Sequence, residues 1–245
     1  MFSLKDACAY SLEPNRLGYC GPENAFKLFS EFIEGKKIPE QEIKDALLRF
    51  NGLRAYLSFI AKENRLEQFD SKALEAYWLG NKLLENISTA KIKGFISDDL
   101  VSAGLSEKKA EEKAKLLPND LLPSHSFHVL FINFLNPKVP AIAKNLSDCL
   151  IQWGEVLEVK PKNRLSVKGI ELLSEGAELK LKEKIKTVEL LYPFPVSEKD
   201  FVSVHWGKAV QVLSKEQAKN LKRFTLQNLS VLSANGLLHS SKLSK

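Results

Sequence analysis

The sequence has few cysteines, and their number and spacing exclude a disulfide-stapled fold. Cys8, Cys20 and Cys149 are odd in number and far apart along the chain. Free thiols of this kind are typical of a reducing compartment, where they remain open to metal or redox chemistry, so we expect a cytoplasmic protein. The first residues, MFSLKDACAYSLEP, contain no basic region followed by a long apolar run, and we therefore expect no signal peptide.

Long hydrophobic runs and the common catalytic motifs are also missing. The longest apolar candidate, FHVLFINFL over 127–135, is about half as long as a membrane span and predicts a buried strand. The patterns GxxxxGK[ST], GxGxxG, HExxH, CxxC and GxSxG do not occur. We therefore expect no membrane association and none of the enzyme classes that these patterns mark.

The net charge of +6 is spread over the chain rather than gathered in one basic patch. Lysines alternate with glutamates in SEKKAEEKAK (106–115) and in LKLKEKIKTVEL (179–190), which is typical of a solvated surface. Single-stranded nucleic-acid binding would need stacked aromatic side chains on one strand face. We therefore rank nucleic acid last among the partners considered.

Helical periodicity dominates the residues before Pro118, where the pattern predicts five or six helices. One begins after Pro22 and ends near Gly35. Asp70 or Ser71 is a candidate N-cap of another helix, and Ser97 and Ser106 are candidate caps of two further short helices.

Strand-like patterns dominate the second half. We expect strands in SFHVLFINF (126–134), CLIQWGEVLEV (149–159), RLSVKGIEL (164–172), ELKLK (178–182), KIKTVELLY (184–192) and FVSVHWGKAVQVL (201–213). A helix follows from Ser214, whose pairing with Gln217 predicts a capping box. These patterns predict an α+β protein: an all-α N-terminal domain, then a small OB-like β-barrel with a C-terminal helix. The expected divisions are a helical domain over 1–135, a linker over 136–146, the barrel and helix over 147–235, and a polar tail over 236–245.

Two segments of the second half occur in a distinctive order. CLIQWGEVLEV begins with Cys149, and KDFVSVHWGKAVQVLSKEQAKNLKRF (199–224) contains His205. Together they resemble the HypC/HupF family of [NiFe]-hydrogenase assembly chaperones, over about residues 148–230. The family's first motif has a cysteine, an apolar strand and a glycine turn, and its last strand carries a histidine before a glycine and is followed by a helix.

The resemblance implies a hydrogenase maturation factor, which is an assembly chaperone rather than an enzyme. Cys149 would bind iron that carries cyanide and carbon monoxide, the Fe(CN)2CO unit, and His205 would help to hold it. The implied partners are a hydrogenase assembly scaffold protein, the precursor of the hydrogenase large subunit, or both. A soft thiolate suits such an iron centre, and imidazole suits iron generally.

The chain departs from the family pattern at the cysteine. In the family this residue becomes the mature N-terminus, whereas Cys149 follows 148 residues and has no free amine. Ile151, Gln152 and Trp153 stand where the family has Ala-Ile-Pro. Purely structural interpretations also remain open: Cys149 as a small buried hydrophobe and His205 as a hydrogen-bonded core residue.

The helical half offers a second candidate site. Arg16, Tyr19 and Cys20 lie in NRLGYCGPENA, just before a predicted helix, whose N-terminus would lower the pKa of the thiol. We consider these three and Tyr77 candidates for binding a cofactor or small ligand, with a structural loop and an aromatic core as the alternatives.

Two histidines extend this second site. His125 and His128 are three residues apart in SHSFH, and with Cys20 they form a possible metal site. In a rival hypothesis the helical half is an enzyme with a pocket around Tyr19, Cys20, Tyr77 and His128, and the barrel is only a docking module.

Overall fold

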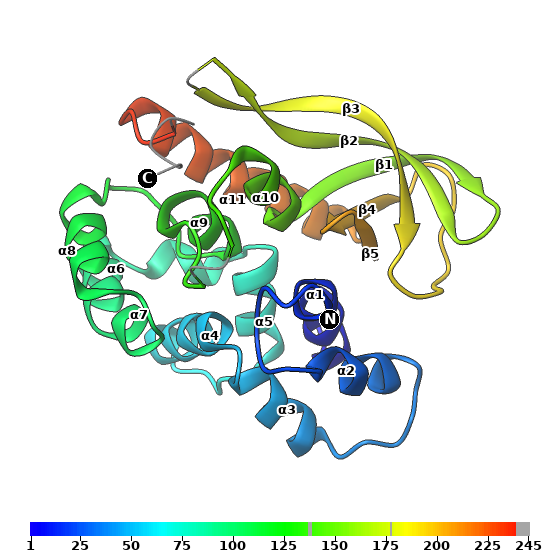
Figure 1. Cartoon of the computed structure of the whole chain (residues 1–245), viewed down its shortest axis with the longest axis horizontal. Helices are drawn as coiled ribbons and strands as arrows, with labels where there is room; N and C mark the ends of the chain where they lie inside the picture. The colour runs from blue at the N-terminus through cyan, green and yellow to red at the C-terminus, as the bar shows by residue number, and fades with distance from the viewer. Residues whose placement is uncertain (137–138, 177, 239–245) are drawn as a thin grey trace.

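Helices come first along the chain, five strands follow, and one long helix ends the described part (Figure 1). The computed structural model describes residues 1–136, 139–176 and 178–238. The helices before the strands are α1 (Leu4–Arg16), α2 (Ala25–Ile33), α3 (Glu40–Leu48), α4 (Asn51–Asn64), α5 (Ser71–Trp78), the 3-10 helix η1 (Lys82–Asn86), α6 (Thr89–Ser97), α7 (Asp99–Ser102), α8 (Glu107–Leu116), α9 (His125–Phe127), the π-helix η2 (His128–Ile132) and α10 (Ala143–Cys149). The strands are β1 (Gln152–Lys160), β2 (Arg164–Glu175), β3 (Glu178–Leu190), β4 (Phe201–His205) and β5 (Lys208–Leu213), and α11 (Lys215–Ala234) follows them.

The helical region contains more helices than expected. Eight α-helices and η1 precede Pro118, so the prediction of five or six was too low. The N-terminal helix α1 was missed, although Ser3 and Asp6 form a complete capping box at its start. Ser97 ends α6 instead of capping the next helix, and Asp98 takes the N-cap position of α7.

Three predicted caps are confirmed. The side chains of Asp70 and Ser106 accept hydrogen bonds from the first turns of α5 and α8. Ser214 and Gln217 form the predicted capping box at the start of α11. Each supplies an acceptor for a backbone N–H that has no partner within its helix.

The five strands form a closed barrel in the order β1-β2-β3-β5-β4. Neighbouring strands are antiparallel except β3 and β5, which pair in parallel at two positions. The segment 201–213, expected as one strand, is a hairpin because Trp206 and Gly207 both have positive φ, as a tight turn requires. Conversely, the two strands expected over 178–192 are the single strand β3.

The segment 126–134 was predicted as a strand, and this is wrong. The structure places its residues mainly in α9 and η2, with every residue from His125 to Ile132 buried. A short run that is apolar on all sides does not distinguish a buried strand from a buried helix. Cys149 was likewise expected to open a strand, but it is the last residue of the helix α10.

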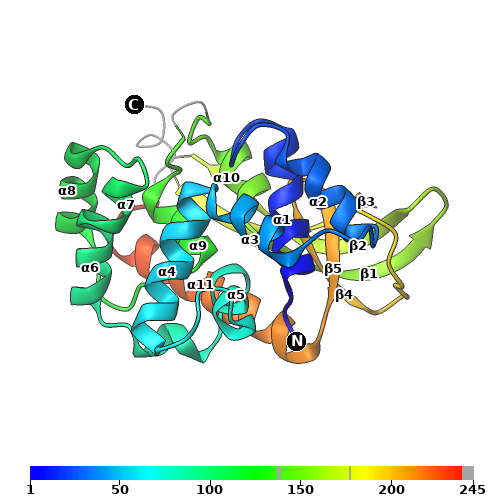
Figure 2. The same ribbon diagram turned by 90° about the horizontal axis from the view of Figure 1, so that it is seen from below.

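The helices and the barrel share a hydrophobic core. One cluster of buried residues includes Tyr10 of α1, Tyr56 of α4 and Leu172 of β2. A second, smaller cluster fills the barrel and includes Val167 and Val202. In Figures 1 and 2 the helices α1, α5, α10 and α11 lie between the strands and the remaining helices. This shared core brings residues from the two halves of the chain together.

The expected division into domains stays a prediction. The helix α10 begins within the expected linker, at Ala143. Most of the expected polar tail, residues 239–245, lies outside the described residues. Within the described part of the chain, no helix is both long enough and apolar enough to span a membrane.

Candidate metal centre

A cavity of about 350 Å³ lies where the helices meet the barrel. Its lining brings together nearly all of the candidate residues from both predicted sites, namely Tyr19, Cys20, Tyr77, His125, His128, Cys149 and His205. The two candidate sites are therefore one. Arg16 is not part of the lining, because its guanidinium pairs with the Glu13 carboxylate at 2.6 Å.

Three of these residues form a compact group of possible metal ligands. His125 from α9, Cys149 from α10 and His205 from β4 each offer one atom, and these atoms lie within 4.8 Å of one another. The residues are only 5%, 4% and 2% exposed. A metal at the usual ~2.0–2.3 Å from nitrogen and sulfur would draw them somewhat closer together.

The imidazole of His205 is oriented by the backbone of α1. Its Nδ1 lies 2.9 Å from the carbonyl oxygen of Tyr10. A carbonyl only accepts, so Nδ1–H donates and the lone pair is on Nε2. This Nε2 is buried and makes no hydrogen bond within the described part of the chain. A metal-ligating histidine is commonly held in this way.

His125 is hydrogen-bonded at both ring nitrogens. Nε2 lies 2.9 Å from the Cys149 carbonyl oxygen and 3.8 Å from the Cys149 Sγ, and Nδ1 lies 3.1 Å from the Tyr77 hydroxyl. Without a metal, Nε2–H donates to the carbonyl. Ligation of a metal through Nε2 would place the ring proton on Nδ1, from which it could be donated to the Tyr77 hydroxyl.

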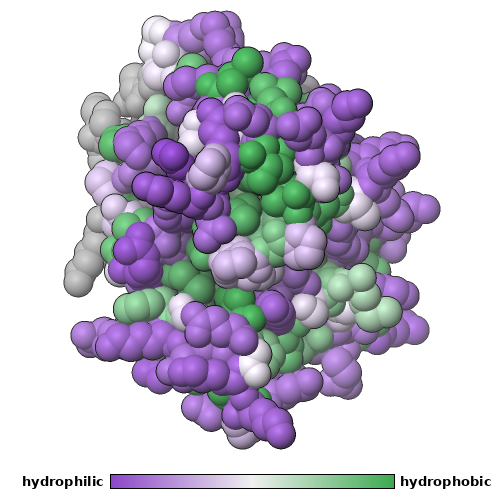
Figure 3. Space-filling view, turned by 90° about the vertical axis from the view of Figure 1, so that its right-hand side faces the viewer, coloured by the Kyte–Doolittle hydropathy of each residue, from purple (hydrophilic) through white to green (hydrophobic). Residues whose placement is uncertain are grey.

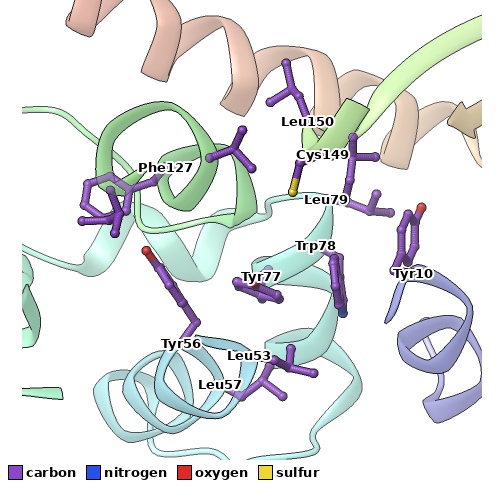
Figure 4. Close-up of a cluster of buried hydrophobic side chains, with 14 of the residues drawn as sticks. Tyr10, Leu53, Tyr56, Leu57, Tyr77, Trp78, Leu79, Phe127, Cys149 and Leu150 are labelled. Carbon is purple, nitrogen blue, oxygen red and sulfur yellow. The ribbon is translucent and has the colours of Figure 1, made fainter. Parts of the chain in front are cut away.

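The sulfur of Cys149 points from the end of α10 toward Tyr77 and Trp78 of α5 (Figure 4). Burial raises the pKa of this thiol well above its usual value, and the nearby Cys20 adds to the effect. The group is therefore a neutral thiol, and a metal bound to the sulfur would displace its proton.

The histidines of the cavity are neutral at physiological pH. Burial lowers the pKa of His125 to about 4, although its hydrogen bond to the Cys149 backbone partly opposes the shift. Burial also lowers the pKa of His205 well below its usual value, with His125 adding to the effect and the carbonyl groups of Tyr10 and Cys149 opposing it. Of these two carbonyls, that of Tyr10 lies in hydrogen-bonding geometry, and that of Cys149 does not. Neutral imidazole is the form that binds metals.

Cys20 differs from the prediction made for it. The enclosing protein atoms raise the pKa of this thiol to about 11, whereas a helix N-terminus was expected to lower it. The helix α2 begins five residues later, at Ala25, and the side chain of Asn15 accepts from the Phe26 N–H at 2.7 Å. The residue as a whole is exposed, while its thiol lies among the protein atoms that raise its pKa.

His128 lies in the cavity wall but outside the group of three. Burial lowers its pKa to about 3, its Nδ1 has no hydrogen-bond partner within the described residues, and its ring meets that of Tyr56 edge-on at 5.4 Å. The described ligand group thus combines His125 with Cys149 and His205 instead of with Cys20 and His128.

A family model described as "Family of unknown function (DUF6390)" matches residues 5–238. The chain belongs to the DUF6390 family. The match includes the helices, the barrel and every residue of the cavity. No curated protein and no solved structure matches this DUF6390 chain.

Sequence reasoning missed the role of α1 at this site of the DUF6390 protein. The carbonyl of Tyr10 orients His205, and the Tyr10 hydroxyl donates to Ser203 Oγ at 2.8 Å. The Ser3–Asp6 capping box was the signal that could have revealed this helix.

Proposed function

We propose that this protein binds iron at Cys149 and His205, with His125 as a third ligand, and serves as a HypC-like maturation factor of [NiFe] hydrogenase. One observation carries the metal site: the unpartnered Nε2 of buried His205 lies in the same 4.8 Å group as the Cys149 thiol. A buried nitrogen without a partner is costly in a fold unless it binds something.

The chemistry of the three ligands suits an iron cargo. The thiolate is a soft donor that tolerates the electron-rich iron of an Fe(CN)2CO unit, and two imidazoles are ordinary iron ligands. Three protein ligands leave coordination positions open, so that the cargo keeps its own ligands and can leave again. The residues Tyr10 and Tyr77 orient the two imidazoles from behind.

The identity of the cargo rests on the resemblance. The ordered pair of motifs around Cys149 and His205 supports it, and so does the closed barrel, which follows Cys149 in the chain, carries His205 on β4 and is followed by a C-terminal helix. On this basis we propose an all-α part followed by an OB-like barrel. The proposed partners are a hydrogenase assembly scaffold protein and the large-subunit precursor, in the cytoplasm.

The burial of Cys149 limits how delivery takes place. At 4% exposure the residue cannot meet a partner protein directly, so the cargo has to enter and leave through the cavity. This differs from the open N-terminal cysteine that the resemblance implies.

An enzyme remains the second candidate, because Tyr19, Cys20, Tyr77 and His128 line the same cavity. A paired mutant test separates the two functions. If function is lost in Cys20→Ala while Cys149→Ala is tolerated, an enzyme is favoured, and the reverse pattern favours the chaperone.

Infrared spectroscopy tests the proposed function. The protein is purified without air from cells that make [NiFe] hydrogenase. We expect cyanide and carbonyl stretching bands that disappear in the Cys149→Ala variant, together with a co-purifying assembly partner. Preparations with neither bands nor partner would contradict the maturation role.

A further inference from the structure

The cavity has an exposed mouth and a buried floor. Five residues of its lining are exposed to solvent: Cys20, Gly21, Arg49, Asn51 and Gly104. The proposed ligands His125, Cys149 and His205 are all at least nine-tenths buried. Among the thiol- and imidazole-bearing residues of this lining, Cys20 is therefore the one that is exposed.

The loop that carries Cys20 is fixed in place. The buried side chain of Asn15 donates to the carbonyl oxygens of Cys20 and Pro22, at 2.7 Å and 2.8 Å. Gly21 has a φ of +78°, and the ring of Phe50 lies where any larger side chain would begin. These contacts hold Cys20 at the mouth without requiring a metal to order the loop.

Unpartnered nitrogens face the space behind Cys20. His205 Nε2 and His128 Nδ1 line the same cavity, are buried, and make no hydrogen bond within the described residues. Cys20 is thus one member of a cavity with several free donor atoms.

We propose that Cys20 captures the incoming metal at the mouth and passes it to Cys149 by ligand exchange. On capture, the Cys20 thiol releases its proton to solvent as the sulfur–metal bond forms. On transfer, the Cys149–metal bond forms as the Cys20–metal bond breaks, and the proton lost by Cys149 is balanced by one that returns to Cys20. No electron is exchanged. This inference rests on the proposed metal site and adds the route into it.

Stopped-flow uptake of Co²⁺ without air tests the route, with the thiolate-to-cobalt absorption as the signal. In Cys20→Ser we expect the same final amount of bound Co²⁺ and an uptake rate about tenfold lower, a size common when a partner of a metal site is lost. Cys20→His, which restores a ligand at the mouth, recovers most of the rate. Cys8→Ala removes a buried cysteine outside the cavity lining and serves as the control.

The outcomes separate the route from the site. Normal binding with an unchanged rate in Cys20→Ser would overturn the route alone, as would a loss of final Co²⁺ binding, because Cys20 would then be a permanent ligand. Wild-type protein that binds no Co²⁺ would overturn the metal site and the route together.

Discussion

The buried histidines make the protein sensitive to acid, and His128 allows this effect to be isolated. Its pKa is lowered to about 3 by burial first, and then by the nearby His125 and Lys109. In the unfolded chain a histidine has a pKa of about 6.5. Between these two pKa values, His128 is protonated in the unfolded state and neutral in the folded state. The free energy of unfolding therefore has its full value above about pH 6.5 and decreases as the pH falls toward 3.

The magnitude follows from the width of this window. One pKa unit corresponds to about 1.36 kcal/mol, so at pH 5 the single residue His128 removes ~2 kcal/mol of stability relative to pH 7. Phenylalanine cannot be protonated, and its ring can keep the edge-on contact with Tyr56. In His128→Phe the loss of stability between pH 7 and pH 5 should be smaller by ~2 kcal/mol than in the wild type.

Urea unfolding at pH 7 and pH 5 measures this difference. Tyr56→Phe is the matched control, since it changes the partner ring without removing a group that titrates between pH 5 and pH 7, and it should keep the acid sensitivity of the wild type. Equal losses in the wild type and in His128→Phe would refute the reasoning, because His128 would then bind a proton in the folded state as readily as in the unfolded state.

Three further substitutions test the surroundings of the site. In Tyr77→Phe the affinity for Co²⁺, measured by competition with a chelator, should fall about tenfold because His125 loses an orienting partner. Tyr56→Phe should leave this affinity unchanged. Equal affinities in the wild type, Tyr77→Phe and Tyr56→Phe would contradict the role of Tyr77. In Gly80→Ala the new methyl group would meet the ring of Phe224 at 2.5 Å in a backbone with a φ of +83°. We expect thermal or urea unfolding to show a loss of about 2–4 kcal/mol, and a neutral result would mean that α11 moves freely against α5. In Asn228→Ala the N–H and the carbonyl of Leu122 lose the buried amide with which they form hydrogen bonds of 2.8 Å and 3.0 Å. The free energy of unfolding should fall by about 1–3 kcal/mol in the same assay. An unfolding midpoint equal to that of the wild type would contradict this prediction.

Local signals predicted three helix starts and the first turn of the barrel correctly. The N-caps Asp70, Ser106 and Ser214 are confirmed because a cap depends on a side chain and the backbone a few residues away. The turn between β1 and β2 lies at 161–163, between the strands predicted at 149–159 and 164–172. Interactions between residues only a few positions apart can be recognised from a short stretch of sequence.

Tertiary environment decided the elements that were predicted incorrectly. The segment 126–134 is apolar throughout, so its helical form depends on packing against other helices and not on its own pattern. The hairpin at Trp206 and Gly207 interrupts a run with ordinary strand composition.

The candidate metal centre could likewise be predicted only in part from the sequence. The sequence selected Cys149 and His205 by resemblance, and the structure brings their ligand atoms together. It assigned His125 to a different group, since nothing along the chain says that α9 lies against the end of α10. The contact between Tyr10 and His205 joins residues 195 positions apart, which no local pattern reveals.

X-ray absorption spectroscopy of Fe²⁺-loaded protein, prepared without air, tests the central claim most directly. The Cys20→Ser variant is used so that only Cys149 can supply sulfur from the cavity lining. We predict an iron shell with one sulfur and imidazole nitrogens, and its sulfur should disappear when Cys149→Ala is added. An iron shell without sulfur, or one that the second substitution leaves unchanged, would contradict the proposed site.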